Sequence, residues 1–125
     1  MIRIIKTDKA PAATGPYSQA VETNGILYIS GQIPLHPQTG QTTGSEINKQ
    51  TMQVLDNIGA ILVAAGYTFR NVVKTTCYLK NLGDFAAMNE VYATYFTVDP
   101  PARATVEVSR LPKDVLIEIE AVAII

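Results

Sequence analysis

The alternation of apolar and polar residues changes its period along the chain, and these changes mark strands, turns and helices. A short strand is predicted at residues 3–6, and a loop rich in Ala, Pro and Gly follows at 9–16. Asn24-Gly25 then separates two β-prone runs, 17–23 and 26–33. Both residues of a two-residue hairpin turn need positive φ, which Asn and Gly tolerate, so these runs are predicted to form a hairpin.

The turn length fixes the register of this hairpin. The predicted cross-strand pairs are Thr23 with Ile26, Val21 with Tyr28, and Gln19 with Ser30. Tyr17 then lies on the same face as Ser30, at the open end. Gly31 is expected to form a bulge or to let another group approach the backbone closely.

Two segments have helical periodicity. Residues 46–65 carry an apolar stripe, with Ser45 as the expected N-cap and Gly66 as the C-cap. The stripe consists of Ile47, Val54, Leu55, Ile58, Ile61, Leu62 and Ala65. Asp84 is expected to cap a second helix, which Pro100-Pro101 terminates. Its predicted buried stripe is Phe85, Met88, Val91, Tyr92, Tyr95 and Phe96.

Strand periodicity returns in three places, and it sorts the polar side chains by face. In 71–79 the predicted faces are Val73, Thr75, Cys77 and Leu79 against Val72, Lys74, Thr76 and Tyr78. In 103–109, Arg103 and Thr105 share one face. After a turn at 111–114, Glu118 and Glu120 share one face of the last strand. By periodicity alone, these charges could equally be a solvated strand start and a face that discourages edge pairing.

The order of elements predicts an α+β fold with two helices on one face of a mixed six-stranded sheet. The other face would then be open to water. It nevertheless carries apolar residues, namely Val21, Ile26 or Leu27, and Val122 or Ile124, depending on register. A sheet with two apolar faces and helices for only one of them needs a partner, so we expect an oligomer.

Composition limits the classes of function. The 125 residues suit a single domain, residues 1–125. The net charge of −1 and the scattered Lys and Arg residues argue against binding to nucleic acid or anionic membrane. The apolar runs are too short to span a bilayer, and residues 1–6 do not resemble a signal peptide, so a cytoplasmic location is expected. One Cys and one His provide neither an intramolecular disulfide nor a zinc ligand set.

Several short motifs occur together along nearly the whole chain. They are Ala10-Pro11-Ala12, Gly15-Pro16-Tyr17-Ser18-Gln19, Ser30-Gly31-Gln32-Ile33-Pro34, Val73-Lys74-Thr75-Thr76, Asn89, Pro101-Ala102-Arg103, Val106, Leu111-Pro112 and Ile117-Glu118-Ile119. This combination resembles the Rid (YjgF) family of reactive intermediate deaminases, which act on enamines and imines. The resemblance implies a chorismate mutase-like fold and homotrimers whose sheets line a central barrel, with ligand clefts between neighbouring subunits.

The resemblance also implies roles for individual residues. Arg103 matches the arginine that binds the substrate carboxylate, for which a planar guanidinium is well suited. Glu118 matches the glutamate associated with the attacking water. The remaining matches shape the pocket: Tyr17, Ser30, Gly31, Asn89 and Thr105. No metal or other cofactor is expected, because a protonated imine is already electrophilic.

One departure from the family pattern concerns the residues after the arginine. Many members have Ser-Cys there, whereas this chain has Ala104-Thr105. Thr105 can hold a water or a ligand oxygen but cannot supply a thiolate. Cys77 is expected to be a small core residue rather than a replacement.

The resemblance therefore implies a 2-iminobutanoate/2-iminopropanoate deaminase that hydrolyses species such as 2-aminoacrylate to 2-oxo acids and ammonia. One alternative is a trimer that binds small carboxylates in the same cleft without turnover, as a sensor or regulator. A weaker alternative is a translation inhibitor or endoribonuclease, against which the net charge argues.

Overall fold

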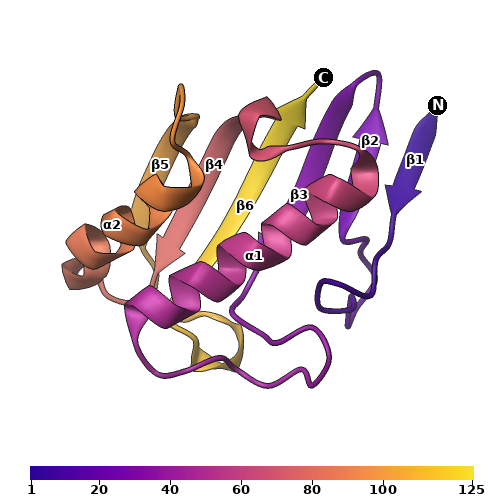
Figure 1. Ribbon diagram of the computed structural model, residues 1–125. Coiled ribbons are helices and arrows are strands. Elements are labelled where there is room, and N and C mark those ends of the chain that lie inside the picture. Colours follow the sequence, from indigo (N-terminus) through magenta and orange to yellow (C-terminus); the bar gives the residue numbers. More distant parts are fainter.

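Six strands form one mixed sheet, and two helices cover one of its faces, as the sequence predicts (Figure 1). The computed structural model describes residues 1–125. The strands are β1 (Ile2–Ile5), β2 (Ala20–Thr23), β3 (Ile26–Gln32), β4 (Val72–Leu79), β5 (Ala102–Glu107) and β6 (Ile117–Ile124). The helices are α1 (Ile47–Ala65) and α2 (Phe85–Tyr95), with short 3₁₀ turns η1 (Phe69–Asn71), η2 (Leu82–Asp84) and η3 (Pro112–Asp114).

The strand order is β1-β2-β3-β6-β4-β5. Only β4 and β5 are parallel neighbours, and α2 makes the crossover between them. β3 and β4 both pair antiparallel with β6, so α1 connects two strands that run in the same direction with β6 between them. The helices therefore lie on the same side of the sheet (Figure 1). This is the α+β arrangement that the element order predicts.

The hairpin is confirmed in detail. Asn24 and Gly25 have φ of 51° and 75°, and Thr23 pairs with Ile26 and Val21 with Tyr28. The amide of Ser30 donates to the carbonyl of Gln19, which extends the predicted register. Between Ile29 and Gln32 the pairing with β6 shifts register. The predicted irregularity at Gly31 is therefore present.

The predicted face of Val73 is wrong. A register shift between Val72 and Lys74 changes the phase of β4, which buries Val72 and exposes Val73. After the shift, Thr75, Cys77 and Leu79 face the helices as predicted.

Both predicted N-caps need correction. At α1 the cap position is Glu46 rather than Ser45, and no side chain caps the helix. Instead, the Gln50 side chain donates to the carbonyl of Gly44 and ties the preceding loop to the first turn. Asp84 does occupy the cap position of α2, but its side chain makes no capping hydrogen bond.

The predicted stripe of α2 is only partly buried. Met88, Tyr92 and Phe96 are in the core, whereas Phe85 is exposed. Phe85 lies in the first turn of α2 over the Arg103 side chain of β5, which is the edge strand of the sheet, so no further strand covers the ring.

The hydrophobic core lies between the helices and the sheet. Its centre is the predicted stripe of α1, in which Val54, Leu55, Ile58, Ile61 and Leu62 are fully buried. Gly66 ends this helix in the left-handed conformation (φ 86°), as predicted. Neither helix has the combination of length and apolar character needed to cross a membrane.

The other face of the sheet has no covering element. It presents apolar side chains such as Ile4, Tyr28 and Ile124, which are 59 %, 50 % and 46 % exposed. Contiguous apolar surface of this kind is unusual on a monomer and marks an interaction surface. We call this surface, which includes Ile2, Ile4, Val21, Ile26, Tyr28, Val122 and Ile124, the open face.

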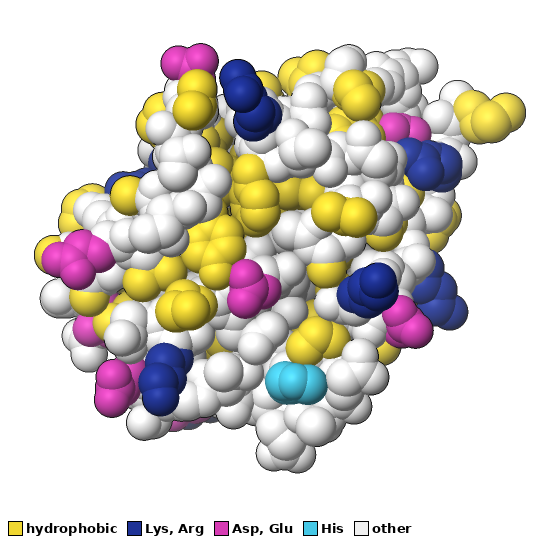
Figure 2. Space-filling model, viewed as in Figure 1, with side chains coloured by type: hydrophobic (Ala, Val, Ile, Leu, Met, Phe, Trp, Pro, Cys, Tyr) yellow, Lys and Arg dark blue, Asp and Glu magenta, His cyan; other side chains and the backbone are white.

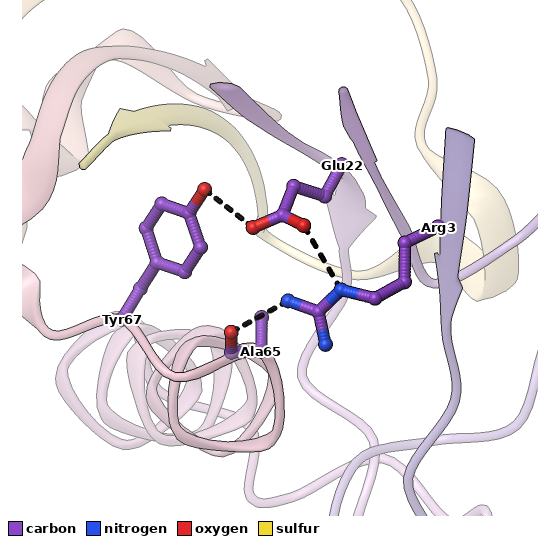
Figure 3. A network of polar contacts seen from close by, with 4 residues as sticks. All are labelled: Arg3, Glu22, Ala65 and Tyr67. Carbon is purple, nitrogen blue, oxygen red and sulfur yellow. Dashed lines mark hydrogen bonds and ion pairs between the residues drawn. The ribbon is translucent and has the colours of Figure 1, made fainter. Parts of the chain in front are cut away.

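A polar network fastens the sheet edge to the end of α1 (Figure 3). Arg3 of β1 donates to Glu22 of β2 at 2.9 Å and to the carbonyl of Ala65 at 2.8 Å. The Tyr67 hydroxyl donates to the other Glu22 oxygen at 2.7 Å. A cation at a helix C-terminus satisfies its free carbonyl groups and opposes its negative dipole end.

Candidate functional site

Arg103 lies on the helix-facing side of β5, where it pairs with Thr75 of β4. Its guanidinium carbon lies 4.7 Å from the centre of the Tyr92 ring and 5.5 Å from that of Phe85. Both distances are within the range of cation–π attraction. Neither of the two ion pairs in the chain involves Arg103. The guanidinium is thus held by two aromatic rings while its N–H groups remain available to an anion.

Helix α2 positions these rings. Phe85, Asn89 and Tyr92 recur at spacings of four and three, so they share the face of the helix that looks toward β5. The Tyr92 hydroxyl is fixed by a buried 2.7 Å hydrogen bond with Thr75 Oγ1. Burial is the main cause that raises the pKa of Tyr92, so the ring stays neutral under the cation.

Two oxygens near Arg103 have no hydrogen-bond partner. They are Asn89 Oδ1 and Thr105 Oγ1, and both atoms are buried. Buried polar atoms are nearly always paired, so these two oxygens have hydrogen-bonding capacity left for a ligand. Asn89, Tyr92 and Arg103 line a hollow of about 480 Å³, together with Pro100, Pro101, Ala93 and Phe96. We call Arg103, Asn89 and Thr105 the arginine set.

Cys77 is the register partner of Thr105 on the neighbouring strand. Its side chain is fully buried, and this burial raises the pKa of its thiol to about 11 despite the opposing effect of the Arg103 charge. The sulfur is therefore a neutral thiol at physiological pH. Its position fits the expected small core residue and offers no thiolate.

Glu118 lies in a different hollow, of about 590 Å³, at the start of β6. The same hollow contains Tyr17, Ser30 and Gly31, and its wall includes Pro112 and Lys113 of η3. A Cβ atom on residue 31 would overlap the Glu118 carboxylate. Glycine at this position therefore allows the carboxylate to lie directly over the backbone, the second of the two predicted uses of Gly31. We call Tyr17, Ser30, Gly31 and Glu118 the glutamate set.

The environment of Glu118 favours its neutral form. The side chain is half-buried, and this burial is the main cause that raises its pKa, with the charge of Glu120 as the second cause. A carboxyl group with a raised pKa in a hollow is a candidate for proton transfer.

Ser30 and Tyr17 have local partners. The Ser30 hydroxyl donates to the carbonyl of Ser18 at 2.6 Å, so it can offer only acceptor capacity to a ligand. Tyr17 is about half exposed, and its hydroxyl accepts a 3.3 Å hydrogen bond from the amide of Thr14. Both residues thus shape the wall of the hollow.

Sequence reasoning missed the residue that organises this wall, Gln19. Its buried side chain bonds both the amide and the carbonyl of Thr7 and donates to the carbonyls of Ala10 and Pro11. A polar residue flanking the hairpin gave no sign of these contacts, since they depend on how the loop at 7–16 folds back. Phe85 and Tyr92 were assigned to the core stripe, although their helical spacing with Asn89 could have indicated a shared face.

The two sets lie on opposite faces of the sheet. Arg103 pairs with Thr75 and Glu118 pairs with Tyr78, and residues 75 and 78 of β4 point to opposite sides. Within one chain the structure therefore brings together the members of each set but does not bring the two sets together. The arginine set lies beside α2, and the glutamate set opens toward the open face.

Comparison with known proteins gives consistent matches. A family profile described as "Endoribonuclease L-PSP" matches residues 7–125. A RutC family protein of Pyrococcus horikoshii is 58% identical over 123 residues, which is 98% of both chains. A mouse protein named 2-iminobutanoate/2-iminopropanoate deaminase is 49% identical and covers 98% of this chain and 90% of its own. The crystal structure of Escherichia coli TdcF with bound serine has a TM-score of 0.95 and 44% identity, covering 98% of both chains.

Proposed function

The chain belongs to the Rid (YjgF) family, whose profile carries the description endoribonuclease L-PSP, and from this premise we propose that it is an imine deaminase. Its substrates would be small 2-imino acids and their enamine tautomers, such as 2-aminoacrylate. The products would be a 2-oxo acid and ammonia. This activity is printed in the name of the mouse relative, which is 49% identical.

The observation that carries the proposal is that the polar groups of the candidate site fall into two separate sets, the arginine set and the glutamate set, and that neither is a complete site by itself. One half has an unpaired guanidinium and two unpaired oxygens. The other has a carboxyl group with a raised pKa over a glycine. We infer that a second copy supplies the missing half, with the open face as the contact surface and three copies in a ring.

Arg103 would bind the carboxylate, the one charged group that all 2-imino acids share. A guanidinium can donate two parallel hydrogen bonds to it, and the Tyr92 ring supports the guanidinium from one side. The unpaired Asn89 Oδ1 and Thr105 Oγ1 would accept hydrogen bonds from the substrate nitrogen. This arrangement orients the electrophilic carbon relative to the carboxylate.

Glu118 would orient the attacking water and take up its proton. As the water oxygen bonds to the iminium carbon, the C=N π electron pair moves to nitrogen and a carbinolamine forms. The proton then returns to the nitrogen, the C–N bond breaks with its pair on nitrogen, and ammonia leaves. The hydroxyl proton is released as the carbonyl forms, so an iminium and one water give a 2-oxo acid and an ammonium ion.

The test is the release of 2-oxo acid from 2-aminoacrylate generated in the assay by a pyridoxal phosphate-dependent dehydratase, corrected for spontaneous hydrolysis. Arg103→Ala should lower kcat/KM on the order of 10²–10³-fold, because hydrogen bonds to a charged group contribute about 1.5–3 kcal/mol each. Arg103→Lys keeps the charge and should recover only part of the loss. Wild-type turnover in Arg103→Ala would refute the proposed role of Arg103 in binding the substrate carboxylate.

Glu118→Gln tests the alternative of a carboxylate-binding protein without turnover. The serine in the TdcF structure gives this alternative some support. A deaminase should lose turnover in Glu118→Gln while it still binds a 2-oxo acid. A binding protein would release 2-oxo acid no faster than the uncatalysed control, with or without Glu118.

An RNA-directed activity is not part of the proposal, in spite of the family description. The net charge is −1, and on the helix-covered side the basic side chains are scattered among acidic and apolar ones (Figure 2). Binding to a phosphate backbone depends on grouped cations.

A further inference from the structure

A second carboxylate lies next to Glu118. Glu120 is two residues further along β6 and points to the same face, and it borders two hollows. One is the hollow of the glutamate set. The other, of about 370 Å³, lies on the open face beside Tyr28, Lys74 and Thr76. Glu120 thus connects the candidate site with the interior of the open face.

Tyr78 holds this carboxylate. It is the register partner of Glu118 on β4, yet its hydroxyl reaches diagonally to Glu120 Oε2 at 3.2 Å. Burial and then the charge of Glu120 raise the pKa of Tyr78, so its hydroxyl stays protonated and donates. The two ion pairs of the chain are elsewhere, between Arg3 and Glu22 and between Lys80 and Asp114. Glu120 is therefore held by a neutral donor, and no ion pair cancels its charge.

We propose that Glu120, held by Tyr78, is a positioning residue for Glu118: its negative charge lies beside the Glu118 carboxyl group on the same strand face and favours the protonated form of that group. The catalytic consequence of this coupling rests on the proposed deaminase function, but the coupling itself does not. Neither Glu120 nor Tyr78 belongs to the arginine set or to the glutamate set.

The reaction explains why such coupling is useful. Glu118 has to take a proton from water and later return it to the nitrogen. An ordinary carboxyl group is ionised near pH 7 and is a weak base, so it does the first task poorly and rarely holds a proton for the second. Burial favours the neutral form of Glu118, and the Glu120 charge adds to this effect.

Other charged and titratable groups also face the pair. The cations near it are Lys113 of η3 and Lys74 of β4, which line the two hollows without forming an ion pair. The remaining titratable groups on these walls are Tyr17, Tyr28 and Tyr78. The lysines are opposite in charge to the two carboxylates, so the contribution of Glu120 must be measured by removing its charge alone.

The experiment is a titration of the glutamate side-chain carboxyl groups by ¹³C NMR in the full-length protein. Glu118→Gln and Glu120→Gln assign the two resonances. In Glu120→Gln the pKa of Glu118 should fall, because a like charge that opposed ionisation is gone. Glu46→Gln removes the same charge from the exposed cap position of α1 and should leave the Glu118 pKa unchanged.

Tyr78→Phe is the second variant, and it keeps both carboxyl groups. Without this donor the Glu120 carboxylate is no longer held beside Glu118, so the pKa of Glu118 should fall in this variant as well. In the assay, the acid limb of the kcat/KM profile should move to lower pH in Glu120→Gln, in step with the Glu118 titration. The substrate KM, which depends on Arg103, should change little.

The outcomes separate this coupling from the deaminase function. An unchanged Glu118 pKa in Glu120→Gln overturns the coupling, and an unchanged Glu118 pKa in Tyr78→Phe overturns the holding role of Tyr78, whatever the turnover. A shifted Glu118 pKa in a protein that hydrolyses no imine supports the coupling and overturns the deaminase function.

Discussion

At the scale of single residues, Gly31 decides where the Glu118 carboxylate can lie. The carboxylate occupies the space that a Cβ atom on residue 31 would need. Gly31 also lies in the bulge of β3, where the pairing with β6 shifts. A small change in this one side chain therefore acts directly on the geometry of the proposed base.

Gly31→Ala should displace Glu118 and lower kcat by about 10- to 100-fold, since misplacing a reacting group by about 1 Å can cost two orders of magnitude. The measurement is kcat for 2-aminoacrylate hydrolysis, with circular dichroism to verify folding. Gly83→Ala is the matched control, because no atom lies within 4 Å of its added Cβ and its φ is not positive. Equal activity of the two variants would contradict the role of Gly31.

Alternation along single strands was enough to group some of the candidate residues. Arg103 and Thr105 share a face, and so do Glu118 and Glu120. The unpaired oxygens of Asn89 and Thr105 could not be foreseen, because they depend on how closely α2 packs over β5. The same holds for the position of the Arg103 guanidinium between Tyr92 and Phe85.

At the scale of elements, the strongest sequence signals were local ones. The Asn24-Gly25 turn sets the hairpin register without help from the rest of the chain, and that register is confirmed. The face of Val73 was wrong because the irregularity of β4 arises where it pairs with β6, nearly fifty residues later. A bulge produced by a distant partner leaves no trace in the alternation of a single strand.

The junction between β1, β2 and the end of α1 also depends on side chains far apart in sequence (Figure 3). Tyr67 is buried, and this burial, followed by its hydrogen bond to Glu22, raises its pKa to about 12. The hydroxyl therefore remains a donor over the physiological pH range. Arg3 completes the junction by donating to the carbonyl of Ala65.

Tyr67→Phe should lower the free energy of unfolding by about 1 kcal/mol, because it removes one buried donor from the junction. Urea denaturation at fixed protein concentration measures this change. In a Glu22→Ala background the same substitution should cost less, since its acceptor is already absent. An equal cost in both backgrounds would mean that the Tyr67–Glu22 bond does not stabilise the junction.

At the scale of the whole molecule, the open face and the separation of the arginine set from the glutamate set both support the proposed association of several copies of the chain. The sequence indicated that helices would cover only one side of the sheet, and the structure has apolar side chains exposed on the other. What the sequence could not indicate is that Arg103 and Glu118 face opposite sides of the sheet. That depends on the phase of β4, β5 and β6 relative to one another.

Val122→Glu places a charge within the open face and should prevent formation of the proposed trimer. Sedimentation velocity should give about three times the chain mass of 13.5 kDa for the wild type and the monomer mass for the variant. Val63→Glu is the matched control, because Val63 is 76% exposed on the outer side of α1. A wild-type monomer, or dissociation by Val63→Glu alone, would contradict the assignment of the open face.

The most direct test of a site shared between copies is complementation between two inactive variants. Arg103→Ala and Glu118→Gln are co-expressed with different affinity tags, and mixed oligomers are purified through both tags. Each homogeneous variant should be nearly inactive. In every mixed trimer, whichever variant is in the majority, one of the three clefts would combine an intact Arg103 with an intact Glu118 from a neighbour, which is about a third of the clefts. We expect 2-aminoacrylate hydrolysis to recover to that order. Mixed oligomers as inactive as the two parents would contradict the shared site.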